Sequence, residues 1–162
     1  MYEMMALVEA SFFAEGLRSL GVWTYGIVNL AHIIGISLLF GAIAILDLRL
    51  LGLWQSLTIA TIATITVPVA AAGASIAIPS GLSMFAMNAT QYHGNPFLYL
   101  KLPVLIFALA NVVVVTRLGA WRRAVLGGLV QSRDNSILFV AGAFSLFSWS
   151  FVLVCGRMIG YW

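Results

Sequence analysis

Four long runs of apolar residues dominate the chain, and short polar connections separate them. The first run, from Val22 to Leu46, contains no charged residue. At ~1.5 Å of rise per residue, a helix of this length crosses a hydrocarbon core ~30 Å thick. The predicted membrane-spanning helices cover residues 22–46, 57–78, 96–116 and 136–160. The pattern therefore predicts an all-α fold, an integral membrane four-helix bundle in a single domain that covers residues 1–162.

Residues 2–20 follow a different pattern, in which apolar and acidic stretches alternate. Phe12 and Phe13 lie between Glu9 and Glu15. We predict an amphipathic helix that lies in the membrane interface. The alternative is a short lead-in helix that packs on the bundle.

The second run is rich in threonine and alanine and contains Pro68, which favours a place inside the bundle. The sequence Pro79-Ser80-Gly81 predicts that this helix ends at residue 78. Residues 82–94 are too short and too polar to span, so we expect a surface segment, either interfacial or re-entrant. Pro96 fits the first position of the third helix.

Composition supports a lipid environment. The chain has 162 residues, of which 62% are hydrophobic and 8% charged, whereas soluble domains carry about 25% charged residues. The net charge of +3 is spread over segment ends, so we expect the lipid bilayer as a partner and no nucleic acid. The single cysteine, Cys155, excludes a cysteine-based metal cage.

The distribution of arginine predicts the orientation. Arginines of the two connections that follow the first and third spans lie on one side: Arg49, Arg117, Arg122, Arg123 and Arg133. By the positive-inside rule these connections are cytoplasmic. We therefore expect a multi-pass protein of the bacterial inner membrane with both termini on the periplasmic side.

His32 is the ionisable residue deepest in the first span, and Asn29 lies one turn earlier on the same helix face. A neutral imidazole in an apolar bundle can be an axial ligand of b-type haem. It can equally form an interhelical hydrogen bond to a serine or threonine, or serve a proton or quinone site.

His93 is the other histidine of the chain and the candidate second metal ligand. By residue counting it lies on the order of 10 Å closer to the outer surface than His32. Bis-histidine ligation would need residues 79–95 to fold back into the bundle. Ligation by His32 from two protomers is a second route, and a solvated loop histidine is the alternative.

Lys101 and Arg157 each lie about one turn inside the outer end of a span. Their aliphatic stems allow both to snorkel to the interface. They can instead face inward and bind an anionic or polar group, such as haem propionates, a lipid phosphate or a quinone. Together with His32, Asn29 and Tyr92, they predict a polar site in the outer leaflet.

Asp47 and Arg49 close the first span, and we interpret them as a local ion pair or a helix-end anchor. The chain lacks a P-loop, a dinucleotide-binding fingerprint, an HExxH motif and a nucleophile elbow. We therefore expect no catalytic activity of its own.

Several segments resemble a family of small bacterial four-helix inner-membrane proteins of uncharacterised function. They are Leu30 to Gly35, Leu46 to Gly52, Gly94-Asn95-Pro96 with Lys101, and Gly156 to Tyr161. The resemblance implies a stand-alone four-helix unit in which this histidine, lysine and arginine recur. It implies no activity.

Three functions follow, in order of preference. The first is a b-type haem-binding electron-transfer subunit that works at the outer face with quinone or a periplasmic redox partner. Its cofactor-binding residues would be His32, His93, Asn29, Lys101 and Arg157, with both histidines as metal ligands. The second is a non-catalytic subunit that anchors other membrane or periplasmic proteins or self-associates. The third is a small-solute transporter or channel.

Overall fold

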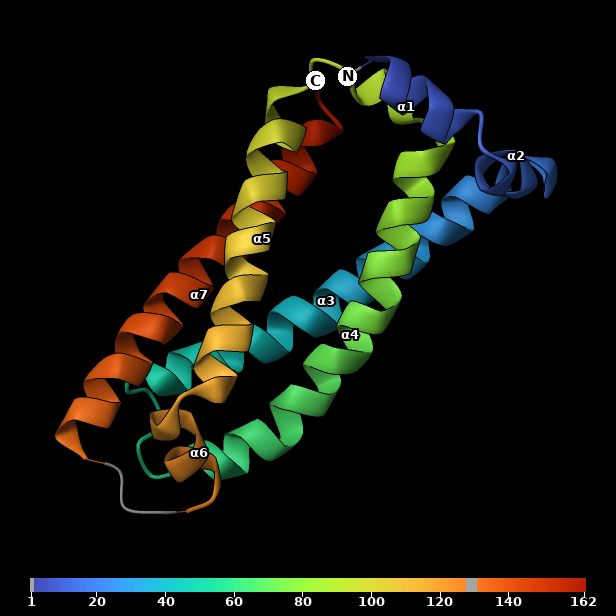
Figure 1. Cartoon of the computed structure of the whole chain (residues 1–162). Helices are drawn as coiled ribbons and strands as arrows, with labels where there is room; N and C mark the ends of the chain where they lie inside the picture. Colours follow the sequence, from blue (N-terminus) through green and yellow to red (C-terminus); the bar gives the residue numbers. More distant parts are fainter. Residues whose placement is uncertain (1, 128–130) are drawn as a thin grey trace. The chain divides into compact units, whose positions relative to one another are not determined.

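A computed structural model describes residues 2–127 and 131–162, and in these residues it contains helices and no strand (Figure 1). This confirms the predicted all-α class. The helices, in chain order, are α1 (Tyr2–Glu9), α2 (Phe12–Ser19), α3 (Thr24–Leu50), α4 (Ile59–Met87), the 3-10 helix η1 (Ala89–Tyr92), α5 (Pro96–Arg117), α6 (Gly119–Val125) and α7 (Ser132–Ile159).

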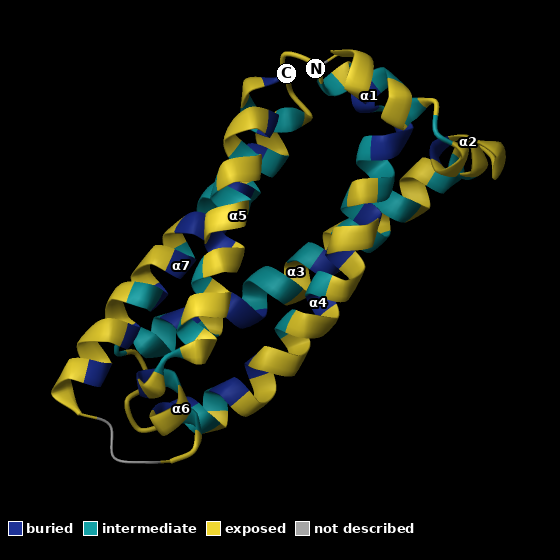
Figure 2. Cartoon of the chain, in the orientation of Figure 1, coloured by how far each residue is buried: buried dark blue, intermediate teal, exposed yellow. Residues whose placement is uncertain are grey.

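Helices α3, α4, α5 and α7 are long and apolar enough to cross a membrane. In the most apolar part of each, only 17% to 33% of the positions are buried. Figure 2 shows exposed positions along all four helices. Because most of these exposed side chains are apolar, water would be an unfavourable solvent for them. The chain is therefore a multi-pass membrane protein.

Helix α4 corrects the predicted end of the second span. It continues without a break through Pro79 and Gly81 to Met87, so residues 82–87 are not a separate surface segment. Serine hydroxyls next to the proline bind helix carbonyls: Ser80 donates to Ile76 O at 2.6 Å and Ser83 to Pro79 O at 2.8 Å. Such bonds help a helix in lipid to tolerate proline.

The N-terminal segment contains two short helices where one was predicted over residues 2–20. They meet at Ala10 and Ser11, and the Ser11 hydroxyl caps α2 by accepting a bond from Ala14 N at 3.3 Å. Serine is a favoured N-cap because its oxygen satisfies an otherwise free backbone N–H. The chain can therefore turn between α1 and α2.

The chain forms two compact units, and α3 and α4 contribute to both. The first unit contains residues 2–39 and 71–95, and the second contains residues 40–70, 96–127 and 131–162. In the first unit, α3 and α4 approach backbone to backbone at Gly35 and Gly73. A Cβ atom added at Gly35 would lie only 2.6 Å from the backbone nitrogen of Ala77.

In the second unit, α5 and α7 run alongside each other (Figure 1). The side chain of Asn111 on α5 donates to Ala141 O on α7 at 3.3 Å. At one end of this unit, Ala120 and Ala124 of α6 pack with Ile59 and Leu138. The short helix α6 lies in the connection after α5 and was not predicted.

An ion pair joins α6 to the start of α7. The guanidinium of Arg123 donates to both oxygens of Asp134, with distances of 2.9 Å from Nε to Oδ2 and 2.6 Å from Nη2 to Oδ1. These hydrogen bonds hold the pKa of Arg123 above its ordinary value. A two-pronged pair of this kind fixes geometry better than a single contact.

Candidate functional site in the first unit

His32 is held against α4 by its ring nitrogen Nδ1. This atom lies 2.8 Å from Ala77 O and 3.1 Å from the Ser80 hydroxyl. A backbone carbonyl can only accept, so Nδ1 carries the proton and donates it to Ala77 O. Ser80 donates its own proton to Ile76 O and can accept from the same nitrogen. In the neutral form of the ring, the lone pair then resides on Nε2.

Gly81 makes room for the imidazole. A Cβ atom at this position would lie 2.8 Å from Cε1 of His32 and 3.3 Å from Nδ1. Any larger residue would push the ring away from α4. Gly73, Ala77 and Gly81 are spaced four residues apart and so form one small-residue face of α4. This spacing is the sequence signal that could have predicted the surface of α4 against which His32 packs.

The face of α3 that carries His32 continues toward the start of the helix. Asn29 is half-buried one turn before His32, and Tyr25 lies one turn before Asn29. Tyr25 hydrogen-bonds Tyr92, whose ring stacks on Phe85 with centroids 6.0 Å apart. Burial, followed by the hydrogen bond with Tyr25, raises the pKa of Tyr92. Tyr92 therefore stays protonated at neutral pH.

His93 lies beyond the end of α4 and directly after η1. It is exposed, and its ring meets that of Tyr2 edge to face, with centroids 5.4 Å apart. His32 lies opposite Gly81, six residues before the end of α4, which corresponds to ~9 Å along the helix axis. The two histidines therefore have different surroundings, and the role of His93 as a second metal ligand stays a prediction.

Lys101 and Arg157 belong to the second unit. Lys101 is half-buried, and its ammonium packs against Gly156, where a Cβ atom would lie 3.3 Å from Nζ. Arg157 is exposed, hydrogen-bonds the hydroxyl of Tyr161 and lies over the Tyr161 ring at 4.6 Å from its centroid. Their proposed role as partners of propionates stays a prediction.

Glu9 of α1 and Arg18 of α2 attach these two helices to the end of α4 and to the segment that follows it. We call these contacts the Glu9 clasp. One oxygen of Glu9 accepts bonds from both the backbone N–H and the hydroxyl of Thr90, each at 2.7 Å. Arg18 donates to Met87 O at 3.1 Å and to Glu9 O at 2.7 Å. The bonds from Thr90, first the hydroxyl and then the N–H, lower the pKa of Glu9.

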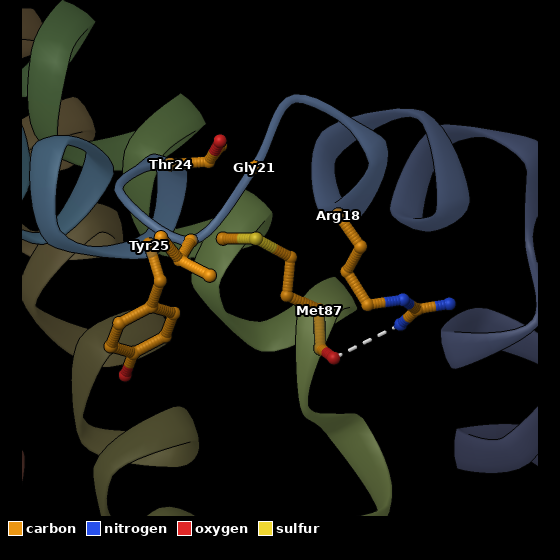
Figure 3. Close-up of a pocket in the computed structure, with 6 residues that line it drawn as sticks. Arg18, Gly21, Thr24, Tyr25 and Met87 are labelled. Atoms are coloured by element: carbon orange, nitrogen blue, oxygen red, sulfur yellow. Dashed lines mark hydrogen bonds between the residues drawn. The ribbon is translucent and has the colours of Figure 1, made fainter.

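A pocket of about 300 Å³ opens beside this clasp. Figure 3 shows Arg18, Tyr25 and Met87 around it, with the bond from Arg18 to Met87 O. Val22 and Met87 supply its apolar side chains, and Arg18, Thr24 and Tyr25 supply its polar ones. Within residues 2–127 and 131–162, no group of three or more His, Cys, Asp or Glu side chains could hold a metal ion.

No protein-family model matches this chain, and no curated protein or solved structure matches it either.

The interpretation of Asp47 and Arg49 as a local ion pair is wrong. Arg49 donates through Nε to Leu57 O at 2.7 Å, as a helix-end anchor would. Asp47 is buried and lies near Ser145 of α7, in the second unit. Sequence proximity favoured Arg49 as the neighbour of the carboxyl, whereas the polar side chain near it belongs to a distant helix.

The Glu9 clasp makes the attachment of α1 dependent on pH. Because the folded state favours the carboxylate, the contribution of the clasp is complete above the ordinary glutamate pKa of 4.5. It is lost as pH falls through the lower pKa of the folded state. We expect Glu9→Gln to increase the rate of amide hydrogen exchange in residues 2–19 at pH 7. In acid, where the wild-type Glu9 carboxylate becomes protonated, the exchange rates of the variant and the wild type should become more similar.

Glu15→Gln is the matched control, since Glu15 is exposed on the neighbouring helix. Comparing the variants with wild type at each pH removes the intrinsic pH dependence of exchange. Equal protection in wild type and Glu9→Gln at pH 7 would contradict the clasp.

Proposed function

We propose that this protein is a small membrane subunit that binds b-type haem through His32 and transfers electrons. The hydrogen bond from Nδ1 of His32 to Ala77 O carries the proposal. Histidines that ligate metals usually donate their other ring N–H to a carbonyl or carboxylate, which fixes the tautomer and makes the ligating nitrogen more basic. His32 has this arrangement inside an apolar helix pair.

The residues around His32 fit an axial ligand. Ala77 O orients the ring, and Gly81 provides the space in which the ring lies against α4. The exposed apolar side chains of the spanning helices suit a flat, apolar macrocycle. Bound haem would supply one-electron chemistry, while the chain sets the ligand, its tautomer and the apolar surroundings.

The pocket beside Arg18 supports quinone as the exchange partner. Its volume of about 300 Å³ lies at the small end of ligand sites. Tyr25 and Arg18 supply hydrogen-bonding groups there, and Met87 supplies apolar contact. A quinone ring needs this combination, and a lipid head group would use the same residues.

A second candidate function is that of an anchoring subunit without a cofactor. The same bond from His32 to Ala77 O would then act only as a latch between α3 and α4. The close contact at Gly35 and Gly73 favours such a rigid helix pair. An optical spectrum separates the two functions.

We propose that the protein resides in the bacterial inner membrane with its arginine-rich connections in the cytoplasm. The positive-inside rule supports this orientation. Alkaline phosphatase fused after Trp162 should be active, and phosphatase fused after Arg123 should be inactive. The reverse pattern would contradict the orientation.

The haem proposal predicts the spectrum of the purified wild-type protein. We expect a Soret band and an α-band in the reduced-minus-oxidised difference. His32→Ala should abolish both bands because it removes the axial ligand. Gly81→Ala should reduce haem content because the added Cβ would displace the ring.

His93→Ala is the informative companion variant. If His93 is the sixth ligand, the variant keeps its haem but changes from a low-spin to a high-spin spectrum. Circular dichroism checks that each variant is folded. Wild-type protein from haem-sufficient cells that shows no Soret band would overturn the proposal and favour the anchoring subunit.

A further inference from the structure

Asp47 is a buried carboxyl in the second unit, and the proposed function does not use it. It lies one turn before the end of α3 and is only 4% exposed. The Ser145 hydroxyl of α7 lies near the carboxyl, while Oδ2 has no hydrogen-bond partner among the described residues. A buried carboxyl with an unpartnered oxygen inside a spanning helix is costly to keep charged.

The face of α7 that meets Asp47 is built closely around it. A Cβ atom at Gly142 would lie 3.3 Å from Asp47 O and 2.9 Å from the Cβ of Leu50. Ser145 and Trp149 follow on the same face at helical spacing, and both are buried. The indole N–H of Trp149 also lacks a partner among the described residues. This part of the unit therefore contains one buried acceptor, Asp47 Oδ2, and one buried donor, Trp149 Nε1, without partners among the described residues.

No cation among the described residues of the second unit forms an ion pair with Asp47. Arg49 on the same helix bonds Leu57 O, and Arg123 of α6 pairs with Asp134 of α7. Lys101 of α5 packs at Gly156, which is ~16 Å along α7 from Ser145. The part of α4 in this unit, residues 59–70, has no titratable side chain. The remaining arginines of α5, α6 and α7 are exposed: Arg117, Arg122, Arg133 and Arg157.

We propose that Asp47 is a proton-binding site within the membrane-spanning part of the chain. A proton on the carboxyl removes a charge that no cation offsets, and Ser145 orients the group. Its place one turn from the end of α3 lets the proton exchange with the solution at that end of the helix. The site takes a proton as its ligand and requires neither haem nor quinone.

A hydrophobic carbodiimide tests this site. Dicyclohexylcarbodiimide reacts with protonated carboxyls in apolar surroundings. The acid proton moves to a carbodiimide nitrogen, the carboxylate oxygen bonds to the central carbon, and rearrangement gives an N-acylurea without loss of any atom. Mass spectrometry of the full chain in lipid vesicles should find the adduct on Asp47, with a yield that falls as pH rises.

Two controls separate a buried proton site from an exposed acid. A water-soluble carbodiimide with glycine ethyl ester should modify the exposed residues Glu3 and Glu15 and spare Asp47. Asp47→Asn should not form the adduct. Ser145→Ala should still form it at pH values at which the wild type no longer does, because the hydroxyl no longer stabilises the ionised carboxylate.

Three results would overturn the proposal: no adduct on Asp47 at any pH, equal modification by the water-soluble reagent, or protection by Na⁺ at constant pH. The last would assign the site to a metal cation. A folded Ser145→Ala variant with an unchanged pH profile would also contradict the role of Ser145.

Discussion

The close approach of α3 and α4 is the contact on which the first unit depends. An apolar side chain gains little free energy when it leaves lipid to contact a neighbouring helix, because both surroundings are apolar. Helices in lipid therefore associate through close backbone contact and hydrogen bonds. Gly35 and Gly73 allow that proximity, because neither position has room for a Cβ atom. The bond from His32 to Ala77 O forms only because the helices lie this close. The glycines and the histidine are therefore parts of one contact.

The polar residues inside the spans fall into two kinds. Some are satisfied by helix carbonyls, as Asn111 is by Ala141 O and Ser80 is by Ile76 O. Their role in packing is sufficient to explain them. Asp47 is of the other kind, since one of its oxygens has no partner among the described residues. His32 stands between the two, because the bond that secures it to α4 would also fix its tautomer in the proposed metal ligation.

The sequence predicted the spanning helices where their ends carry chemical signals. Pro96 begins α5, and the predicted end of that span lies one residue from Arg117, where the helix ends. The end of α4 could not be predicted in the same way. Pro79 normally signals a break, and whether a helix continues through proline depends on local hydroxyls and on neighbouring helices.

The candidate site was predicted in part for a similar reason. His32 could be identified because an ionisable residue inside a span is rare. Its partner Ala77 O is a backbone atom on another helix, which no residue type reveals. Asp47 and Arg49 were interpreted as a local ion pair or a helix-end anchor, because the place of Asp47 near Ser145 depends on how α3 and α7 pack. Contacts between helices distant in sequence are what a single sequence leaves open.

The dependence on backbone contact is tested most directly by two alanine substitutions in α3. Gly35→Ala places a Cβ against the backbone of α4, whereas Gly26→Ala places one where no atom lies within 4 Å. The measurement is the free energy of unfolding in lipid bicelles. We expect Gly35→Ala to lower it by about 1–3 kcal/mol and Gly26→Ala to leave it unchanged or raise it slightly. Equal stability of the two variants would contradict the account.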